Sequence, residues 1–97
     1  MNHPKISHVK PLADKRLLVI FHNKVQKIYD CTPLFTLERF GLLQTDAFFP
    51  TVQVDAGGYG ISWNDEIDLS EYELWENGVE IERVADKSEF AVEAAPQ

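Results

Sequence analysis

Short runs of apolar residues, separated by turn-forming residues, predict a set of strands in the first third of the chain. Residues 16–22 contain Leu-Leu-Val-Ile-Phe, a run rich in β-branched and aromatic side chains and too short for a comfortable helix. Because the run is apolar on both sides, we expect a central strand, at least partly covered on both faces. Residues 8–12 predict a neighbouring strand, which Pro11 restricts to an edge because proline has no N–H to donate. Residues 13–15 suit the turn between them.

A return strand is predicted over residues 25–30. Residues 23–24 (Asn-Lys) suit a two-residue hairpin loop, although lysine is a poorer second residue than glycine. With that loop, Val19 faces Ile28 across the hairpin.

A helix is predicted to follow this hairpin. Thr32 can cap its first N–H groups, Pro33 loses nothing at the first helical position, and Gly41 suits its end. Residues 45–49 predict one further helical turn, which Pro50 stops. The apolar stripe of the longer helix is expected to pack on the sheet and consists of Leu34, Leu37 and Phe40.

The middle of the chain predicts a second antiparallel hairpin. Residues 51–55 alternate as Thr-Val-Gln-Val-Asp, which is typical of a half-buried strand with its valines inward. Residues 56–58 form a turn in which glycine allows a positive φ. Residues 59–63 return, with three side chains on one face: Tyr59, Ile61 and Trp63.

The most specific local signal marks a helix over residues 71–77. Ser70 and Glu73 form a capping box, in which each side chain can accept from an exposed backbone N–H. Residues 77–78 (Asn-Gly) predict a left-handed stop. A hydrophobic staple is expected at the helix start between Leu69 and Leu74.

These elements make one small α+β domain over residues 8–84. We expect an antiparallel sheet of about five strands with two or three short helices packed on it. Residues 79–84 predict a last edge strand, which would permit a homodimer. Residues 1–7 are expected to form a loose leader, and residues 85–97 a flexible tail.

The order and spacing of these motifs resemble the small bacterial family catalogued as domain of unknown function 2442. The motifs are a strand ending Val-Ile-Phe-His-Asn, a return ending Tyr-Asp-Cys-Thr-Pro-Leu-Phe, the glycine turn, Ile-Ser-Trp and Asp-Leu. The resemblance covers roughly residues 8–76. The residues that we take as its structural signature are Phe21, Asp30, Phe49, Gly58, Trp63, Asp68, Leu69, Ser70 and Glu73.

The resemblance implies a compact α+β fold and an interaction or regulatory role. Some members of that family are fused to a helix-turn-helix domain, and others lie beside a second small protein, as in toxin–antitoxin pairs. This chain departs from the pattern at Lys24, where the family commonly has a turn glycine, and no helix-turn-helix follows residue 84. The second departure argues against direct transcriptional control.

The charge balance argues against a nucleic-acid partner. Sixteen acidic residues stand against nine basic ones, for a net charge of −7, and would repel a phosphate backbone. Six of the basic residues do concentrate in the first third of the chain, where they can make a modest positive patch or simply solvated strand edges. They are Lys5, Lys10, Lys15, Arg16, Lys24 and Lys27.

Other bulk features narrow the class of protein. Cys31 is the single cysteine, which excludes an internal disulfide and a thiolate metal site. No run approaches the ~18 apolar residues of a membrane span. The sequence Met-Asn-His-Pro-Lys at the start lacks the apolar core of a signal peptide. We therefore expect a cytoplasmic protein with no membrane association and no cofactor.

The candidate functional surface is the acidic stretch that holds Asp65, Glu66 and Asp68. Carboxylates this close could hold a divalent cation, but the spacing of a calcium loop is missing. The simpler reading is that Asp68 accepts from backbone N–H groups beside the helix start, while the other two carboxylates are solvated.

Four further features of the sequence each have a chemical and a structural interpretation. Cys31 precedes a predicted helix start, as a nucleophile would, yet a single cysteine is usually buried and inert. The glycines of residues 57–60 suit a hairpin turn better than a phosphate loop, because a strand follows them. His3, His8 and His22 lack the spacing of metal ligands. The aromatic residues, which could stack bases or form the core, are Tyr59, Trp63, Tyr72 and Trp75.

We therefore predict a non-enzymatic module that binds another protein, in particular a small basic one, through its acidic surface or an exposed strand edge. A regulatory or antitoxin-like role fits the resemblance. The alternatives are a small metal-dependent hydrolase that uses Asp65, Asp68 and a histidine, and a weak nucleic-acid binder that uses the N-terminal lysines.

Overall fold

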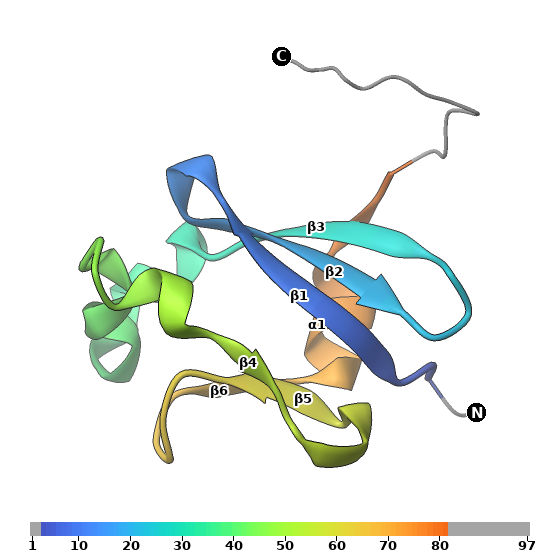
Figure 1. Cartoon of the computed structure of the whole chain (residues 1–97). Helices are drawn as coiled ribbons and strands as arrows, with labels where there is room; N and C mark the ends of the chain where they lie inside the picture. Colours follow the sequence, from blue (N-terminus) through green and yellow to red (C-terminus); the bar gives the residue numbers. More distant parts are fainter. Residues whose placement is uncertain (1–2, 82–97) are drawn as a thin grey trace.

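The computed structural model describes residues 3–81, which form two antiparallel sheets, one α-helix and five short 3-10 helices. In Figure 1 the two sheets lie one above the other, and α1 packs behind them. The predicted α+β class, with antiparallel strands and short helices, is confirmed. The strands divide into a sheet of four and a sheet of three, where the sequence predicted a single sheet.

The larger sheet has the strand order β1-β2-β3-β7. Its strands are β1 (Ile6–Leu12), β2 (Arg16–Phe21), β3 (Gln26–Asp30) and β7 (Val79–Glu80). The central position of β2 and the edge positions of β1 and β7 agree with the predictions. β1 begins at Ile6, two residues earlier than expected, and Ile6 is buried with 1% of its surface exposed. The predicted residues 82–84 of the last strand and the predicted tail lie outside the described residues.

The predicted register of the first hairpin is wrong by one residue. Val19 faces Lys27 rather than Ile28, because the loop has three residues instead of two. The N–H of Phe21 donates to the Val25 carbonyl (2.9 Å), and Lys24 between them has φ of 77°. This is the three-residue hairpin loop that ends with a left-handed residue, a position that favours glycine. Because this position holds lysine and not glycine, the sequence did not indicate the three-residue loop.

The predicted α-helix after this hairpin is also wrong. The chain forms two 3-10 helices, η2 (Thr32–Thr36) and η3 (Glu38–Gln44), separated by Leu37 in an extended conformation (φ −98°, ψ 125°). Thr32 does not cap the segment; its N–H and hydroxyl both donate to Asp30 Oδ1. Gly41 lies inside η3 instead of ending a helix. Because 3-10 helices repeat every three residues, the spacing of the apolar residues suits them as well.

The predicted helical turn over residues 45–49 is present, because the N–H groups of Phe48 and Phe49 donate to the Thr45 carbonyl (3.1 and 3.0 Å). It leads directly into the 3-10 helix η4 (Phe49–Thr51), so Pro50 lies in the first turn of η4 and does not stop the segment as predicted. Proline is acceptable in a first turn because the N–H that it lacks would be unpaired. The result places Phe49 in the core beside Trp63, whose indole N–H donates to the Phe49 carbonyl (2.8 Å).

The smaller sheet consists of β4 (Gln53–Val54), β5 (Gly60–Ser62) and β6 (Asp68–Ser70), in that order. The predicted β4–β5 hairpin is confirmed, and β6 was not predicted. The turn between β4 and β5 is the 3-10 helix η5 (Ala56–Gly58), which has positive φ at Gly57 and Gly58. A Cβ on Gly58 would lie 2.5 Å from the Ile6 carbonyl oxygen. Glycine at this position therefore lets the turn lie against β1 of the larger sheet.

The helix α1 (Glu71–Asn77) has the predicted bounds. Ser70 Oγ accepts from the Glu73 N–H (3.0 Å), as the capping signal predicted. The predicted left-handed stop is wrong, because Gly78 is extended (φ −76°, ψ 153°). A Cβ on Gly78 would lie 2.6 Å from the Leu74 carbonyl oxygen, so glycine is needed there for space.

One apolar cluster joins both sheets to the helices. The larger sheet contributes the inner face of β2 and Tyr29 of β3. The smaller sheet contributes Ile61 of β5 and Leu69 of β6. Leu74 of α1 is completely buried between them. The largest fully buried side chains are Phe21, Ile6, Leu17, Leu43, Ile61 and Leu74. This packing fixes the mutual positions of α1, η2, η3 and β6, which surround the candidate site.

Candidate functional site

The acidic stretch before α1 divides into an exposed turn and a strand. Asn64 Oδ1 accepts from the N–H groups of Glu66 and Ile67, at 2.8 Å each, and fixes the turn. Asp65 and Glu66 are exposed on this turn. Asp68 lies farther along, at the start of β6, and does not accept from the helix start; Ser70 performs that role. The three predicted carboxylates therefore do not form one cluster.

Asp68 instead lines a groove of about 560 Å³ between the smaller sheet, α1 and the two 3-10 helices η2 and η3. Asp55 and Glu73, which are distant in sequence, line the same groove. The tertiary fold thus replaces the predicted set with Asp55, Asp68 and Glu73. Sequence reasoning had no signal for this set, because these residues come from three separate elements.

The groove carries more acidic than basic side chains. Arg39 is the one lysine or arginine among its described lining residues, and its guanidinium lies 4.8 Å from the centre of the Phe40 ring. Asp55 Oδ1 accepts from the Ser62 hydroxyl at 2.6 Å. A cationic side chain that entered the groove would therefore meet an excess of carboxylates.

The wall opposite β6 is apolar. It consists of Leu34, Leu37 and Phe40 from η2, η3 and the residue between them. Leu37 is 50% exposed, and Tyr59 at the edge of the groove is 61% exposed. Apolar side chains exposed beside a hollow supply area that a bound partner can bury.

A second hollow of about 500 Å³ continues from the groove along α1. The two hollows share Leu34 and Glu73. The second is lined on its far side by Ile28 and by Val79, which is 70% exposed. An occupant longer than a few residues could therefore contact both the smaller sheet and the edge strand β7.

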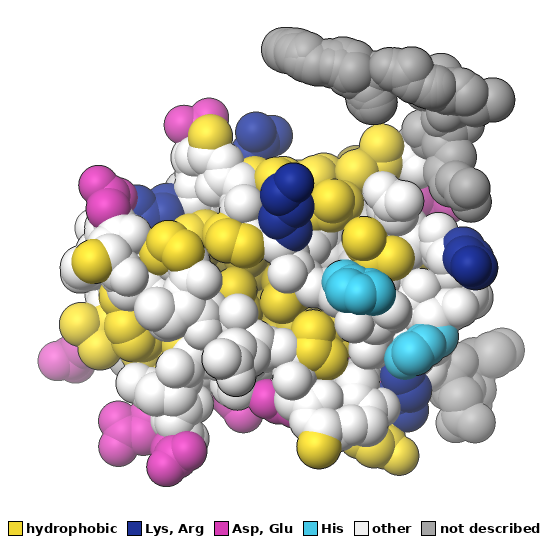
Figure 2. All heavy atoms as spheres, viewed as in Figure 1, with side chains coloured by type: hydrophobic (Ala, Val, Ile, Leu, Met, Phe, Trp, Pro, Cys, Tyr) yellow, Lys and Arg dark blue, Asp and Glu magenta, His cyan; other side chains and the backbone are white. Residues whose placement is uncertain are grey.

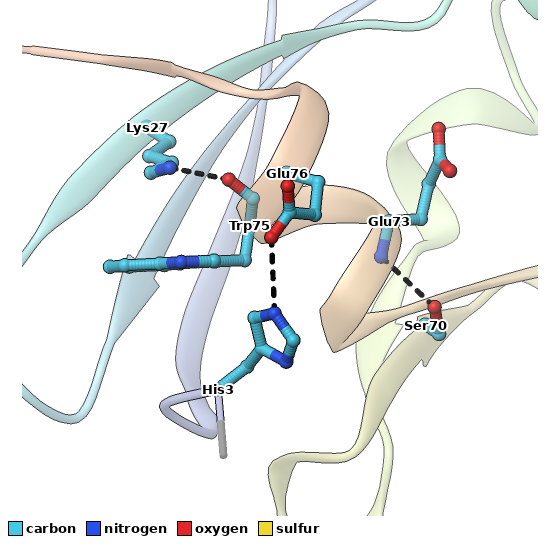
Figure 3. Close-up of polar contacts among 6 residues, drawn as sticks. All are labelled: His3, Lys27, Ser70, Glu73, Trp75 and Glu76. Atoms are coloured by element: carbon cyan, nitrogen blue, oxygen red, sulfur yellow. Dashed lines mark hydrogen bonds and ion pairs between the residues drawn. The ribbon is translucent and has the colours of Figure 1, made fainter. Parts of the chain in front are cut away.

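Glu73 stands between the two hollows and has a second function in the fold. Figure 3 shows that its N–H donates to Ser70 while its carboxylate points away from Ser70. That carboxylate accepts from the hydroxyl of Tyr29 (2.8 Å). Burial, followed by the hydrogen bond and negative charge of Glu73, raises the pKa of Tyr29 above its ordinary range. The predicted capping box thus forms only its serine half.

Cys31 is completely buried in the core. Burial first, and the charge of Asp30 second, raise the pKa of its thiol to about 12. A thiol with this pKa is neutral near pH 7, whereas a nucleophilic cysteine acts as the thiolate.

The histidines lie in separate environments. The His3 ring lies 4.8 Å edge-on from Tyr72, and its Nε2 lies 3.2 Å from Glu76 (Figure 3). His8 Nδ1 lies 2.7 Å from the Ser7 hydroxyl. Across residues 3–81, no three side chains of the types His, Cys, Asp and Glu lie close enough to hold a metal ion between them. The predicted set of Asp65, Asp68 and a histidine is therefore not assembled there.

The four candidate stacking residues also separate. Trp63 is buried, and Trp75 packs edge-on against Phe21 with ring centres 5.0 Å apart. The Lys27 ammonium lies 4.0 Å from the centre of the Trp75 ring and donates to the Trp75 carbonyl (Figure 3). Tyr59 and Tyr72 are exposed, so half of the set belongs to the packed interior.

The N-terminal cations do not gather into one patch. Lys5 pairs with Glu71 (2.7 Å), and Lys15 pairs with Asp46 (2.6 Å). The hydrogen bond from Lys15 holds the pKa of the Asp46 carboxyl below its usual range. Figure 2 shows the lysine and arginine side chains of the visible face standing apart from one another.

The outward face of the larger sheet has an apolar row as well. Register places Leu18, Ile28 and Val79 side by side on neighbouring strands, with Lys10 at the end of the row. Figure 2 shows apolar side chains gathered over these strands. The predicted homodimer stays a prediction.

None of the helices in the described residues has the length and apolar character needed to cross a membrane.

A family model with the description "Protein of unknown function (DUF2442)" matches residues 6–80. The chain therefore belongs to this family, as the order of its motifs indicated. Searches of the curated proteins and of the solved structures gave no match. The description of the family states no activity.

Proposed function

We propose that this member of the DUF2442 family is a cytoplasmic, non-enzymatic module that binds a small basic protein in the groove lined by Asp55, Asp68 and Glu73. The observation that carries the proposal is the combination of these carboxylates with exposed apolar side chains in one hollow. A regulatory or antitoxin-like role, in which the module holds its partner in an inactive complex, is the form of this function that we favour.

The chemistry of the groove supports a protein partner. Its apolar wall can bury the aliphatic and aromatic anchors that supply most of the binding energy of an interface. The surrounding carboxylates favour lysine and arginine side chains and would speed the association of an oppositely charged partner. The net charge of −7 acts in the same direction over a longer range.

The polar contacts of the carboxylates in the groove suit binding rather than catalysis. The carboxylates that line it are engaged in part by neutral donors, Ser62 at Asp55 and Tyr29 at Glu73. Neither contact activates a nucleophile or holds a proton donor against a substrate position. These contacts support binding better than catalysis.

Affinity capture from native cells tests the proposal when it compares variants. The bait proteins are the wild type, the double variant Asp68→Asn/Glu73→Gln, and Asp65→Asn as a control that removes one charge outside the groove. We expect the wild type and the control to retain the same small basic protein, and the double variant to lose it. Equal recovery by all three baits, or repeated recovery of no basic protein, would overturn the proposal.

A further inference from the structure

The side of the groove formed by β6 is a free strand edge. β6 is the last strand in the order β4-β5-β6, and its residues Asp68, Leu69 and Ser70 all line the groove. An unpaired strand edge presents N–H and C=O groups that can bind another chain.

The register identifies which backbone groups point outward. The Trp63 N–H donates to the Ile67 carbonyl, and the Glu71 N–H donates to the Tyr59 carbonyl. The backbone N–H and C=O groups of the odd-numbered residues in this segment therefore point toward β5. This follows because alternate residues of an antiparallel strand bond to the same neighbouring strand. Asp68 and Ser70 consequently direct their N–H groups away from β5. Within the described residues, neither N–H has a hydrogen-bond partner, and both residues are exposed.

The wall across from this edge is apolar, and acidic side chains lie around it. A strand that paired with β6 would direct alternate side chains to opposite faces. One set would lie toward the apolar side chains of Leu34 and Leu37, and the other toward the carboxylate of Asp68, all of which line the groove. The groove thus matches an extended segment in which apolar and basic residues alternate.

We infer that the partner segment binds in an extended conformation and adds to β6 as a fourth strand of the smaller sheet. This inference rests on the proposed function and specifies how the partner is held. In such strand addition the main chain supplies part of the affinity and the alternate side chains supply specificity. A charged residue on an edge strand also prevents unwanted pairing. That role accounts for the charge of Asp68 but not for the apolar wall opposite it.

A peptide of defined sequence tests the mode of binding directly. The probe is an acetylated and amidated heptapeptide in which lysine and valine alternate, added to the ¹⁵N-labelled full chain. We expect the largest amide shifts at Asp68 and Ser70, together with slower exchange of these two amides with solvent. Shifts confined to other surfaces, or no shifts at low salt, would overturn strand addition.

Two methylated forms of the same peptide separate main-chain pairing from side-chain attraction. One form carries N-methyl groups on every valine amide and the other on every lysine amide, so each blocks one edge of the peptide. Strand addition predicts that one form binds at least about tenfold more weakly than the other, because only one edge faces β6. Equal affinity of the two forms would contradict strand addition.

A variant pair in the protein extends the test to the captured partner. Asp68→Pro removes the outward N–H as well as the charge, whereas Asp68→Asn removes the charge alone. Proline is acceptable on an edge strand where its N–H is not in the ladder. We expect binding by Asp68→Pro to be at least about tenfold weaker than binding by Asp68→Asn. If both bind equally weakly, the acidic groove remains the binding site and strand addition is wrong.

Discussion

The carboxylate of Glu73 accepts a hydrogen bond from the hydroxyl of Tyr29, which lies 44 positions earlier in the chain. Tyr29 belongs to β3 of the larger sheet, and Glu73 belongs to the first turn of α1 beside the smaller sheet. The 2.8 Å contact therefore ties β3 of the larger sheet to α1 at the point where the two hollows of the groove meet. It holds one carboxylate of the proposed binding surface in a fixed position.

Replacement of Tyr29 with phenylalanine is expected to destabilise the protein by about 1.5–3 kcal/mol, the usual range for a hydrogen bond to a charged group. Chemical denaturation measures the free energy of unfolding. The control is the cycle with Glu73→Gln, in which the two changes should not be additive. Additive losses would mean that the two side chains do not interact in solution.

The cap of α1 gives a second prediction. Ser70→Ala removes the side chain that accepts from the Glu73 N–H and should cost about 1 kcal/mol of stability. Ser70→Asp keeps an acceptor and should retain most of that stability. If the alanine and aspartate variants unfold at the same denaturant concentration, the cap does not contribute.

In the loop between β2 and β3, glycine is expected to be more stabilising than the lysine present at position 24. Lys24 has φ of 77°, which strains a side chain with a Cβ. Lys24→Gly is expected to raise the stability by up to about 1 kcal/mol, after the entropy that glycine adds to the unfolded chain is subtracted. Asn23→Gly is the matched control and should destabilise, because Asn23 Oδ1 accepts from the Val25 N–H. A lower melting temperature for Lys24→Gly would contradict this interpretation of the loop.

Two glycines are expected to respond in opposite ways to alanine. Gly58 has φ of 75°, and a Cβ there would lie 2.5 Å from the Ile6 carbonyl oxygen. Gly58→Ala should therefore cost more than about 2 kcal/mol. A Cβ on Gly41 would meet no atom of another segment within 4 Å, so Gly41→Ala should change the stability little or raise it. Thermal melts of the two variants provide the comparison, and similar losses would contradict the account of the turn.

Stability should fall at alkaline pH because of two buried groups. The folded protein holds the pKa of Cys31 at about 12, above its ordinary value of 9.0, and the pKa of Tyr29 is raised as well. The folded state therefore binds more protons than the unfolded state once the pH exceeds about 9, and stability falls by up to about 1.4 kcal/mol per pH unit for each such group. Cys31→Ala should remove the earlier of the two losses. Chemical denaturation of the wild type and of Cys31→Ala at about pH 8 and about pH 10 measures this loss of stability. An equal change in the free energy of unfolding of the two proteins would contradict the assignment of the loss to Cys31.

Local signals predicted much of the fold. Ser70 identified the start of α1 because its side chain acts on a backbone group only three residues away. The run in β2 predicted a central strand because it is short, apolar on both sides, and rich in β-branched and aromatic residues. The hairpin register failed at Lys24, where the left-handed position holds a residue that does not signal it. The region after Cys31 failed because apolar residues at spacings of three suit both kinds of helix.

The candidate site was less accessible to prediction from sequence. Asp68 was identified among neighbouring acidic residues, but its companions in the groove are Asp55 and Glu73. Asp55 ends the segment before a glycine turn, and Glu73 was interpreted as a capping residue. Only the packing of α1 and η2 beside β6 brings them together, and the strand β6 itself has only three residues. A short strand of this kind leaves too little alternation to be recognised.

The affinity of the captured basic protein for the wild type, Asp68→Asn/Glu73→Gln and Asp65→Asn tests the central claim most directly. Calorimetric titration at low and at physiological salt gives the dissociation constants. We predict that the double variant binds at least about tenfold more weakly than the wild type, that the control binds as the wild type does, and that the difference shrinks at higher salt. Equal affinities for all three proteins at low salt would show that the partner does not bind in this groove.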